Sequence, residues 1–200
     1  MAIFVKRMGV VEYLPAFEAM KDYTLKRGES DPDEFWLLQH PPTYTNGLAG
    51  RSEHLPLAPE IPVLQVDRGG QVTYHGPGQL VLYLLLDLKR RKMGVRDLVT
   101  KMEQSVVELL GNHGIAAESK RDAPGVYVDG AKIASLGLRV RRGCCYHGLS
   151  LNVDMDLSPF SMIAPCGYRG LPVTCVRNLG IPKSVDELGE ELVPILEKRL

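Results

Sequence analysis

The sequence lacks the features that mark a membrane or secreted protein. No uncharged apolar run reaches membrane-spanning length, and the longest, LVLYLLLDL at 80–88, suits a buried strand. The N-terminus, MAIFVKRMGVVEYLPAF, has no charged leader followed by a long apolar core, so we expect no signal peptide. The 24 Lys+Arg balance 24 Asp+Glu, which argues against a nucleic-acid surface over the whole domain. We therefore expect a cytoplasmic protein with no nucleic-acid or membrane partner.

Cysteine is scarce, and its spacing is unlike that of most metal sites. The chain has four cysteines and no C-x-x-C pair. In a reducing compartment they default to free thiols. Cys144 and Cys145 are adjacent and His147 is close by, but adjacent cysteines are awkward joint ligands, so we expect no metal.

Length and pattern predict one α+β domain over residues 1–200, with a mixed sheet flanked by helices. Apolar runs at 34–40, 79–88 and 145–153 predict strands, and the run at 79–88 requires cover on both faces. The turn-rich segment 41–62 is expected to be a long loop. Helical spacing predicts helices over 12–28, ending at Gly28, and over 95–114, ending at Gly111 or Gly114. The inward face of the second helix carries Leu98, Met102, Val106, Leu109 and Leu110.

Local turn and capping signals add two elements. Asp129-Gly130 lies between Val/Tyr-rich and Ile-containing runs, which predicts a two-residue hairpin within 125–140. Ser184 and Glu187 form a capping box for a C-terminal helix. Leu188, Leu192 and Leu196 would face inward, and Pro194 is expected to kink or break that helix.

The segment RGGQVTYHGPGQL, 68–80, is the first candidate binding element. It fits neither common glycine-rich nucleotide pattern and has no lysine at its end to reach a phosphate. Its glycines instead indicate close approach of the backbone to a ligand or a strand. Arg68 is suited to bind a carboxylate or phosphate, but we favour a structural ion pair. His75 is a candidate acid/base group, with a structural role the more common alternative.

Two further residues have the chemistry of a catalytic pair. Cys166, between Pro165 and Gly167, is expected on a turn where a side chain can face a pocket. A nucleophilic cysteine needs a cation or base nearby, and His40, His75 and His147 are candidates. Lys132 is the less usual one. It follows the predicted tight turn within an apolar strand, where burial disfavours its charge, unless it extends to solvent.

Four motifs in order resemble one known family. RGGQVTYHGPGQLVLY, GAKIASLGLRV, HGLSLNV and APCGYRG together are similar to the lipoyl(octanoyl) transferases, the octanoyl-[acyl-carrier-protein]–protein N-octanoyltransferases. The match runs from about residue 35 to residue 176. The resemblance implies the fold of biotin/lipoate protein ligases. It also implies transfer of an octanoyl group from acyl carrier protein to a cysteine and then to a lysine of a lipoyl domain.

The resemblance also implies roles for individual residues. The acyl-thioester cysteine falls on Cys166, and the lysine that activates it and moves protons falls on Lys132. The substrate-contacting segments fall on Arg68, Gly69, Gly70, Gln71, Val72, Thr73, Tyr74 and His75, on Ser135, Leu136 and Gly137, and on Gly148, Leu149 and Ser150. The glycine segment would then form the wall of an acyl pocket, because glycines leave room for a chain. Main-chain amides of Gly137 and Gly148 are candidate donors to an oxyanion.

The implied reaction needs no cofactor and two protein partners. Exchange between thioesters is nearly balanced and amide formation is downhill, so no ATP is expected. The implied partners are octanoyl-acyl carrier protein and the lipoyl domains of 2-oxoacid dehydrogenase complexes and the glycine cleavage H protein. Acyl carrier proteins are acidic, so we expect docking on the basic run 89–92 or on Arg139, Arg141 and Arg142, although both could be ordinary solvated charge.

Two alternatives remain at this point. An ATP-dependent lipoate or biotin ligase of the same fold would need an adenylating loop, and the G-R-G-R-x-G pattern is absent. A non-catalytic acyl-binding module would keep the pocket but have no use for Cys166. The first is tested by ATP–pyrophosphate exchange, and the second by the effect of Cys166→Ser.

Overall fold

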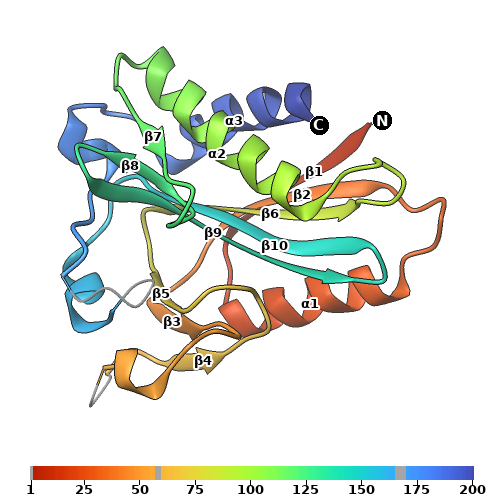
Figure 1. Ribbon diagram of the computed structural model, residues 1–200, viewed down its shortest axis with the longest axis horizontal. Helices are drawn as coiled ribbons and strands as arrows, with labels where there is room; N and C mark the ends of the chain where they lie inside the picture. Colours follow the sequence, from red (N-terminus) through yellow and green to blue (C-terminus); the bar gives the residue numbers. More distant parts are fainter. Residues whose placement is uncertain (1, 57–59, 165–169) are drawn as a thin grey trace.

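The centre of the fold is a seven-stranded mixed sheet (Figure 1). The structure is a computed structural model that describes residues 2–56, 60–164 and 170–200, so Cys166 lies outside the described residues. The strand order is β1 (Ile3–Val10), β2 (Asp33–Gln39), β6 (Gln79–Asp87), β10 (Cys144–Asn152), β9 (Ala131–Arg141), β8 (Val126–Val128) and β7 (Glu118–Ser119). Only β1 and β2 pair in parallel; the other neighbours are antiparallel.

Helices cover both faces of this sheet. Helices α2 (Val95–Asn112) and α3 (Val185–Arg199) lie on one face and α1 (Tyr13–Lys26) on the other (Figure 1). Strand β6 shows why its sequence is continuously apolar: Leu82 and Leu84 pack in the core under α2 and α3, whereas Val81 and Tyr83 pack toward α1. The predicted α+β fold, with a mixed sheet flanked by helices, is confirmed.

A second, three-stranded sheet corrects the predicted long loop at 41–62. Its order is β4 (Val63–Gln65), β3 (Thr43–Asn46) and β5 (Val72–His75), and β3 lies within that segment. A short 3₁₀ turn at Ser52–His54 follows in the same segment. The composition of 41–62 gives turn signals, but all four residues of β3 are buried by pairing with β5, about thirty residues away. Strands β1 and β4 were also not predicted.

The predicted hairpin is confirmed, and its two strands differ in length. Asp129 and Gly130 adopt φ of 48° and 79°, the left-handed geometry of a primed two-residue turn. Strand β8 pairs with β9 only as far as Ala134, so the rest of β9 has no partner from β8. The glycine segment fills part of that gap, where Gly69 N donates to Leu138 O at 2.9 Å.

The helix ends agree with their sequence signals, except at Pro194. Helix α2 stops at Asn112, with Gly114 following at φ 78°, and its five predicted inward residues are fully buried. Helix α3 starts with the Ser184–Glu187 capping box. It continues through Pro194 to Arg199, so of the predicted kink or break the break is wrong. Burial of Leu188, Leu192 and Leu196 on the core offsets the lost backbone hydrogen bond.

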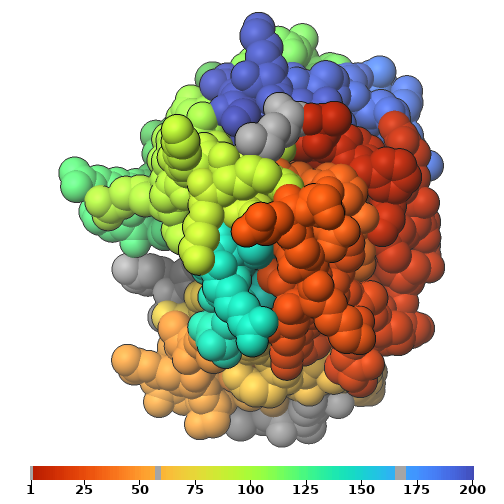
Figure 2. All heavy atoms as spheres, turned by 90° about the vertical axis from the view of Figure 1, so that its right-hand side faces the viewer, coloured from red at the N-terminus to blue at the C-terminus, as the bar shows by residue number. Residues whose placement is uncertain are grey.

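The basic run 89–92 is partly committed to the fold. Asp33, whose side chain is 1% exposed, pairs with Arg27, Arg90 and Arg91 at 2.8, 2.7 and 2.5 Å. The two central arginines of the run are therefore poor candidates for docking. Lys89 lies against Gly143 in the β9–β10 turn, so the run and that turn are neighbours on one face of the molecule (Figure 2). Across the described ranges, no helix is long and apolar enough to cross a bilayer.

Candidate active site

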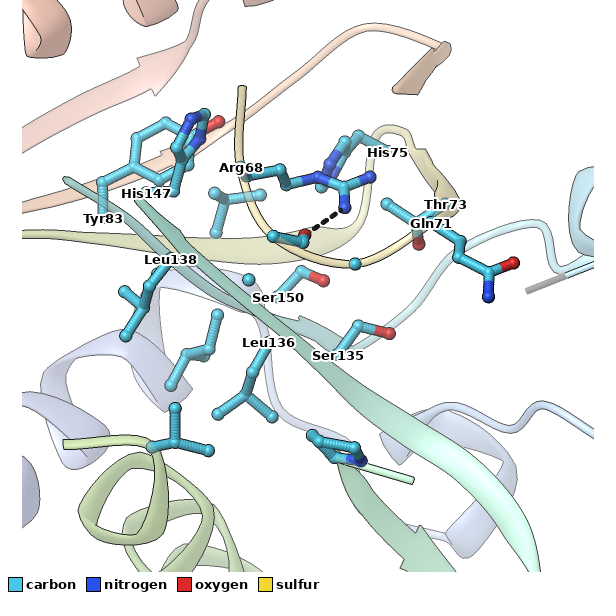
Figure 3. A pocket seen from close by; sticks show the side chains of 18 of the residues that line it. Arg68, Gln71, Thr73, His75, Tyr83, Ser135, Leu136, Leu138, His147 and Ser150 are labelled. Carbon is cyan, nitrogen blue, oxygen red and sulfur yellow. Dashed lines mark hydrogen bonds between the residues drawn. The ribbon is translucent and has the colours of Figure 1, made fainter. Parts of the chain in front are cut away.

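An elongated cavity of about 290 Å³ lies along β9 where β8 has ended (Figure 3). Its walls are β9, the glycine segment, the start of α2 and the central strands β6 and β10. Gln71, Thr73 and Ser135 lie toward one end, and Leu138, His147 and Tyr83 toward the other. The volume is at the lower limit for small-molecule sites, which is about 300 Å³ in a range up to about 1,000 Å³, so the cavity suits one small ligand.

Nearly all predicted substrate contacts line this one cavity. They are Arg68, Gly69, Gly70, Gln71, Val72, Thr73, His75, Ser135, Leu136, Gly137, Gly148, Leu149 and Ser150. The predicted contact Tyr74 is not among the lining residues. It packs against Tyr44 and Phe160, with ring centroids 5.6 and 5.5 Å away, because side chains alternate along β5. That these residues contact a substrate remains a prediction.

Lys132 is buried at the edge of the cavity. Its side chain lines the cavity and is 4% exposed, so it does not extend to solvent. The amine Nζ donates to Pro124 O at 3.0 Å and lies 5.5 Å from the centroid of the Tyr127 ring. The main chain of Lys132 is hydrogen-bonded to the segment that follows Cys166 in sequence. Lys132 N donates to Pro172 O at 2.8 Å, and Thr174 N donates to Lys132 O at 3.0 Å.

Arg68 ties the glycine segment to β3. Its Nη2 donates to Thr45 O and to Thr45 Oγ1, both at 2.8 Å, and its Nη1 donates to Gly69 O at 3.0 Å (Figure 3). Arg68 lines the cavity and is 8% exposed as a residue. Arg68 therefore has a structural role in holding the cavity wall.

The end of the cavity at Tyr83 is built from rings that bind one another. His75 stacks on Tyr13 at 5.5 Å and its Nδ1 is 2.7 Å from Gln79 Oε1. His40 Nε2 is 2.7 Å from the hydroxyl of Tyr83. Burial lowers the pKa of His75 well below its usual value and that of His40 to about 4. His75 is thus part of the cavity wall, and its role toward a substrate stays a prediction.

Asp67 anchors the third histidine. His147 Nε2 lies 3.2 Å from Asp67 Oδ1, and the Tyr146 hydroxyl donates to Asp67 Oδ2. Burial alone would raise the pKa of Asp67, but the hydrogen bonds from His147 and Tyr146 outweigh it and hold the pKa at about 2. His147 also adopts φ 63° within a paired strand, an unusual geometry for a residue with a side chain.

Sequence reasoning missed Tyr13 and Tyr83 as lining residues, and it missed Asp67 as the partner of His147. Tyr13 and Tyr83 follow the helical and strand patterns of core residues, so no local signal marks them. Asp67 directly precedes Arg68 but carries no motif of its own. Their roles arise only from the packing of α1 and the second sheet onto the main sheet.

The glycines on β9 and β10 have different functions. A Cβ on Gly137 would lie 3.1 Å from both Arg68 Cδ and Gly69 O, within the slot between β9 and the glycine segment. A Cβ on Gly148 would collide with Leu82 O. Because β10 lies between β6 and β9, the Gly148 amide points to one of these strands. Gly148 is thus unsuited as the oxyanion donor that we considered from the sequence.

The three other cysteines are buried, and none of them lines the cavity. Cys144, Cys145 and Cys175 are free thiols that are at most 8% exposed. Burial raises the pKa of Cys145 to about 12, so this thiol stays protonated. Among the described residues, no three His, Cys, Asp or Glu side chains gather as a metal site.

Comparison with known proteins identifies the family. The lipoyl protein ligase A/B catalytic domain model matches residues 13–196. The chain belongs to this family. The resemblance predicted from four motifs is therefore confirmed, and it extends beyond them to most of the chain.

Relatives within the family are close and of similar length. The octanoyltransferase of Chromobacterium violaceum is 56% identical over 98% of this chain and 95% of its own length. That of Ectopseudomonas mendocina is 58% identical over 99% and 97%. Among solved structures, lipoate-protein ligase A bound with ATP has a TM-score of 0.82 at 16% identity, covering 100% of this chain and 85% of its own. Biotin protein ligase from Aquifex aeolicus has a TM-score of 0.58 at 12% identity, covering 98% and 68%.

Proposed function

We propose that this protein is an octanoyltransferase of protein lipoylation, which moves an octanoyl group from acyl carrier protein to a lysine of a lipoyl domain. The observation that carries the proposal is full-length identity of 56–58% to octanoyltransferases. The cavity is consistent with it, since a narrow slot lined by Val99, Leu136 and Leu138 suits a short alkyl chain. Each methylene buried there contributes about 0.8 kcal/mol.

The transfer proceeds in two acyl exchanges through Cys166, of which the first is nearly balanced and the second is downhill. The thiolate attacks the thioester carbonyl of the carrier and expels the carrier's thiol, leaving octanoyl-Cys166. The acceptor amine then attacks this thioester and releases the Cys166 thiol as the amide forms. Support for pairing Cys166 with Lys132 comes from the residues after it, because Pro172 and Thr174 bond to the main chain of Lys132.

Lys132 moves the protons in both exchanges. A buried amine beside the cavity is suited to take the proton of the Cys166 thiol and to give it to the departing carrier thiol. In the second exchange the same amine takes a proton from the incoming lysine and returns it to the departing sulfur of Cys166. One group suffices because the second exchange mirrors the first.

The acceptors in this proposal are the lipoyl domains of 2-oxoacid dehydrogenase complexes and the glycine cleavage H protein. The octanoyl donor is an acidic carrier protein, and its docking surface is the β9–β10 turn. Arg141, at the end of β9, and Arg142, in the turn, are both exposed, and Lys89 lies against Gly143 of the same turn. With Arg90 and Arg91 bound to Asp33, this turn is the better candidate of the two basic segments.

The test is intact mass after mixing the protein with octanoyl-acyl carrier protein. We expect an octanoyl adduct on the wild type that hydroxylamine removes. Cys166→Ser should give no adduct that hydroxylamine removes, and Lys132→Ala should form the adduct at least about 100-fold more slowly. No adduct on the wild type, with or without ATP, would contradict octanoyl transfer through a thioester.

The competing function is an ATP-dependent ligase of the same fold. The structural similarity to an ATP-bound lipoate ligase, at 16% identity, concerns the fold alone. ATP–pyrophosphate exchange in the presence of lipoate or biotin separates the two functions. We expect no exchange above the level without acid substrate, and exchange that depends on lipoate would favour the ligase.

A further inference from the structure

Glu103 is a buried carboxylate on α2 that no step above uses. Its side chain is 8% exposed and is not part of the cavity lining. Its Oε1 accepts a hydrogen bond from Gly125 N at 2.9 Å. A buried carboxylate is costly unless it is well bonded, so its contacts show what it holds in place.

The Pro124–Gly125 turn, which Glu103 binds, also binds the amine of Lys132. Pro124 O accepts from Lys132 Nζ at 3.0 Å. Gly125 adopts φ 146°, and a Cβ there would lie 2.5 Å from Lys132 Cε and 3.0 Å from Nζ. The backbone of these two residues therefore sets the position of the amine, and only glycine leaves room for it.

The electrostatics connect the same groups. Burial raises the pKa of Glu103, while the Gly125 amide and the charge of Lys132 act in the opposite direction. The centroid of the Tyr127 ring lies 5.5 Å from the Lys132 amine and 4.6 Å from the Lys120 amine. Helix α2 holds Glu103 rigidly in place, because Leu98, Met102 and Val106 of the same helix are fully buried in the core.

We propose that Glu103 is a positioning residue for Lys132, acting through its hydrogen bond to the Pro124–Gly125 turn. The inference rests on the proposed octanoyl transfer and on the proton-moving role of Lys132 within it. Loss of the bond would let the turn shift and the amine move with it. A shift of about 1 Å at a catalytic group can lower the rate about 100-fold.

The test compares kcat and KM for octanoyl-acyl carrier protein in three variants at Glu103. Glu103→Ala should lower kcat about 10-fold to 100-fold with KM unchanged, because the cavity is intact. Glu103→Gln should stay within about 3-fold of the wild type, since its amide oxygen still accepts from Gly125 N. If the alanine variant does not fold, Glu103→Met replaces it, because methionine has a similar size and helix propensity but lacks the carboxylate. The same loss of kcat is expected.

Two more variants test the route through Gly125. Gly125→Ala should reproduce the kcat loss, because its methyl group would lie 2.5 Å from Lys132 Cε and 2.8 Å from Ala134 O, and both the side chain and the segment would have to shift. Combining it with Glu103→Ala should add little, because both changes act on one turn. Glu108→Ala is the matched control on the same helix; its carboxylate pairs with Arg199 instead, and its kcat should be unchanged.

The outcomes separate this inference from the proposed function. Equal kcat losses in Glu103→Gln and Glu103→Ala, or additive losses with Gly125→Ala, would overturn positioning through the turn. If Glu103→Ala keeps the wild-type kcat while Lys132→Ala is inactive, the proposed role of Glu103 is overturned and that of Lys132 stands. Wild-type kcat in Lys132→Ala would instead remove the proposed role of Lys132.

Discussion

Two buried ionisable groups in this protein differ in the side chains and main-chain groups that they bind. Asp33 is surrounded by charge, with three arginines at 2.5–2.8 Å and the Asp87 amide at 2.8 Å. Lys132 donates to a neutral carbonyl, lies near an aromatic ring and lines a cavity. The first arrangement ties β2 to the ends of α1 and β6. The second holds an amine in place beside space for a substrate, which distinguishes a structural charge from a candidate catalytic one.

The largest expected effect is on activity at Lys132. Lys132→Met keeps the buried aliphatic stem and removes the amine. We expect the rate of octanoyl transfer to fall at least about 100-fold, while the free energy of unfolding changes by less than about 1 kcal/mol. Single-turnover transfer and urea unfolding measure the two quantities. A large loss of stability with a normal rate of transfer would mean that Lys132, like Asp33, has a structural role.

The next effect is on stability at Asp33. Asp33→Ala leaves three arginines without their shared carboxylate, so we expect a loss of about 3–5 kcal/mol in urea unfolding. Transfer per folded molecule should be unchanged, since Asp33 is not among the residues lining the cavity. The control is Asp22→Ala, which removes an exposed pair with Lys26 and should cost less than about 1 kcal/mol. Similar losses at both positions would contradict the comparison.

Gly137 tests the shape of the cavity rather than its charge. A methyl group at Gly137 would narrow the slot beside Arg68 and Gly69. We expect Gly137→Ala to raise KM for the octanoyl donor about 10-fold and to shift preference toward shorter acyl chains, because the far part of the slot is obstructed. Steady-state kinetics with hexanoyl and octanoyl donors measure this. An unchanged ratio between the two donors would contradict the placement of the chain along β9.

Asp67 predicts a pH effect on stability. Its folded-state pKa of about 2 lies below the ordinary 3.8, so the carboxylate stabilises the fold above about pH 4. That contribution is lost as the pH falls from about 4 to about 2. Asp67→Asn should therefore flatten the decline of stability in this range, measured by urea unfolding at each pH. The same slope in both proteins would mean that other carboxylates account for it.

The smallest effect concerns exposed charge. Arg141→Glu with Arg142→Glu should raise KM for octanoyl-acyl carrier protein about 3-fold to 10-fold at low salt, with kcat unchanged, because the turn would repel an acidic partner. Lys198→Glu, an exposed reversal on α3, is the control. Unchanged kinetics at low salt would place the docking surface elsewhere.

Sequence reasoning succeeded where the signal was local. The capping box at Ser184, the hairpin at Asp129-Gly130 and the inward face of α2 all formed as predicted. The glycine segment and the motifs on β9 and β10 lie around one cavity, as the family resemblance implied. Reasoning failed at β3, where turn residues hid a strand that exists through its pairing with β5. It also could not show that Arg90 and Arg91 are bound to Asp33.

The sequence by itself determined the α+β class and the family, because periodicity, turn chemistry and motif order are carried by neighbouring residues. The catalytic pair of Cys166 and Lys132 is what the family resemblance implies, and it stays a prediction. The tertiary structure decided where a cavity exists. The pairing of β8 with β9 ends at Ala134, and the main chain of the glycine segment bonds to β9 at Leu138, about seventy residues away in sequence. It also brought Glu103 under the Pro124–Gly125 turn that holds Lys132. Such contacts depend on packing between distant segments, which no local pattern specifies.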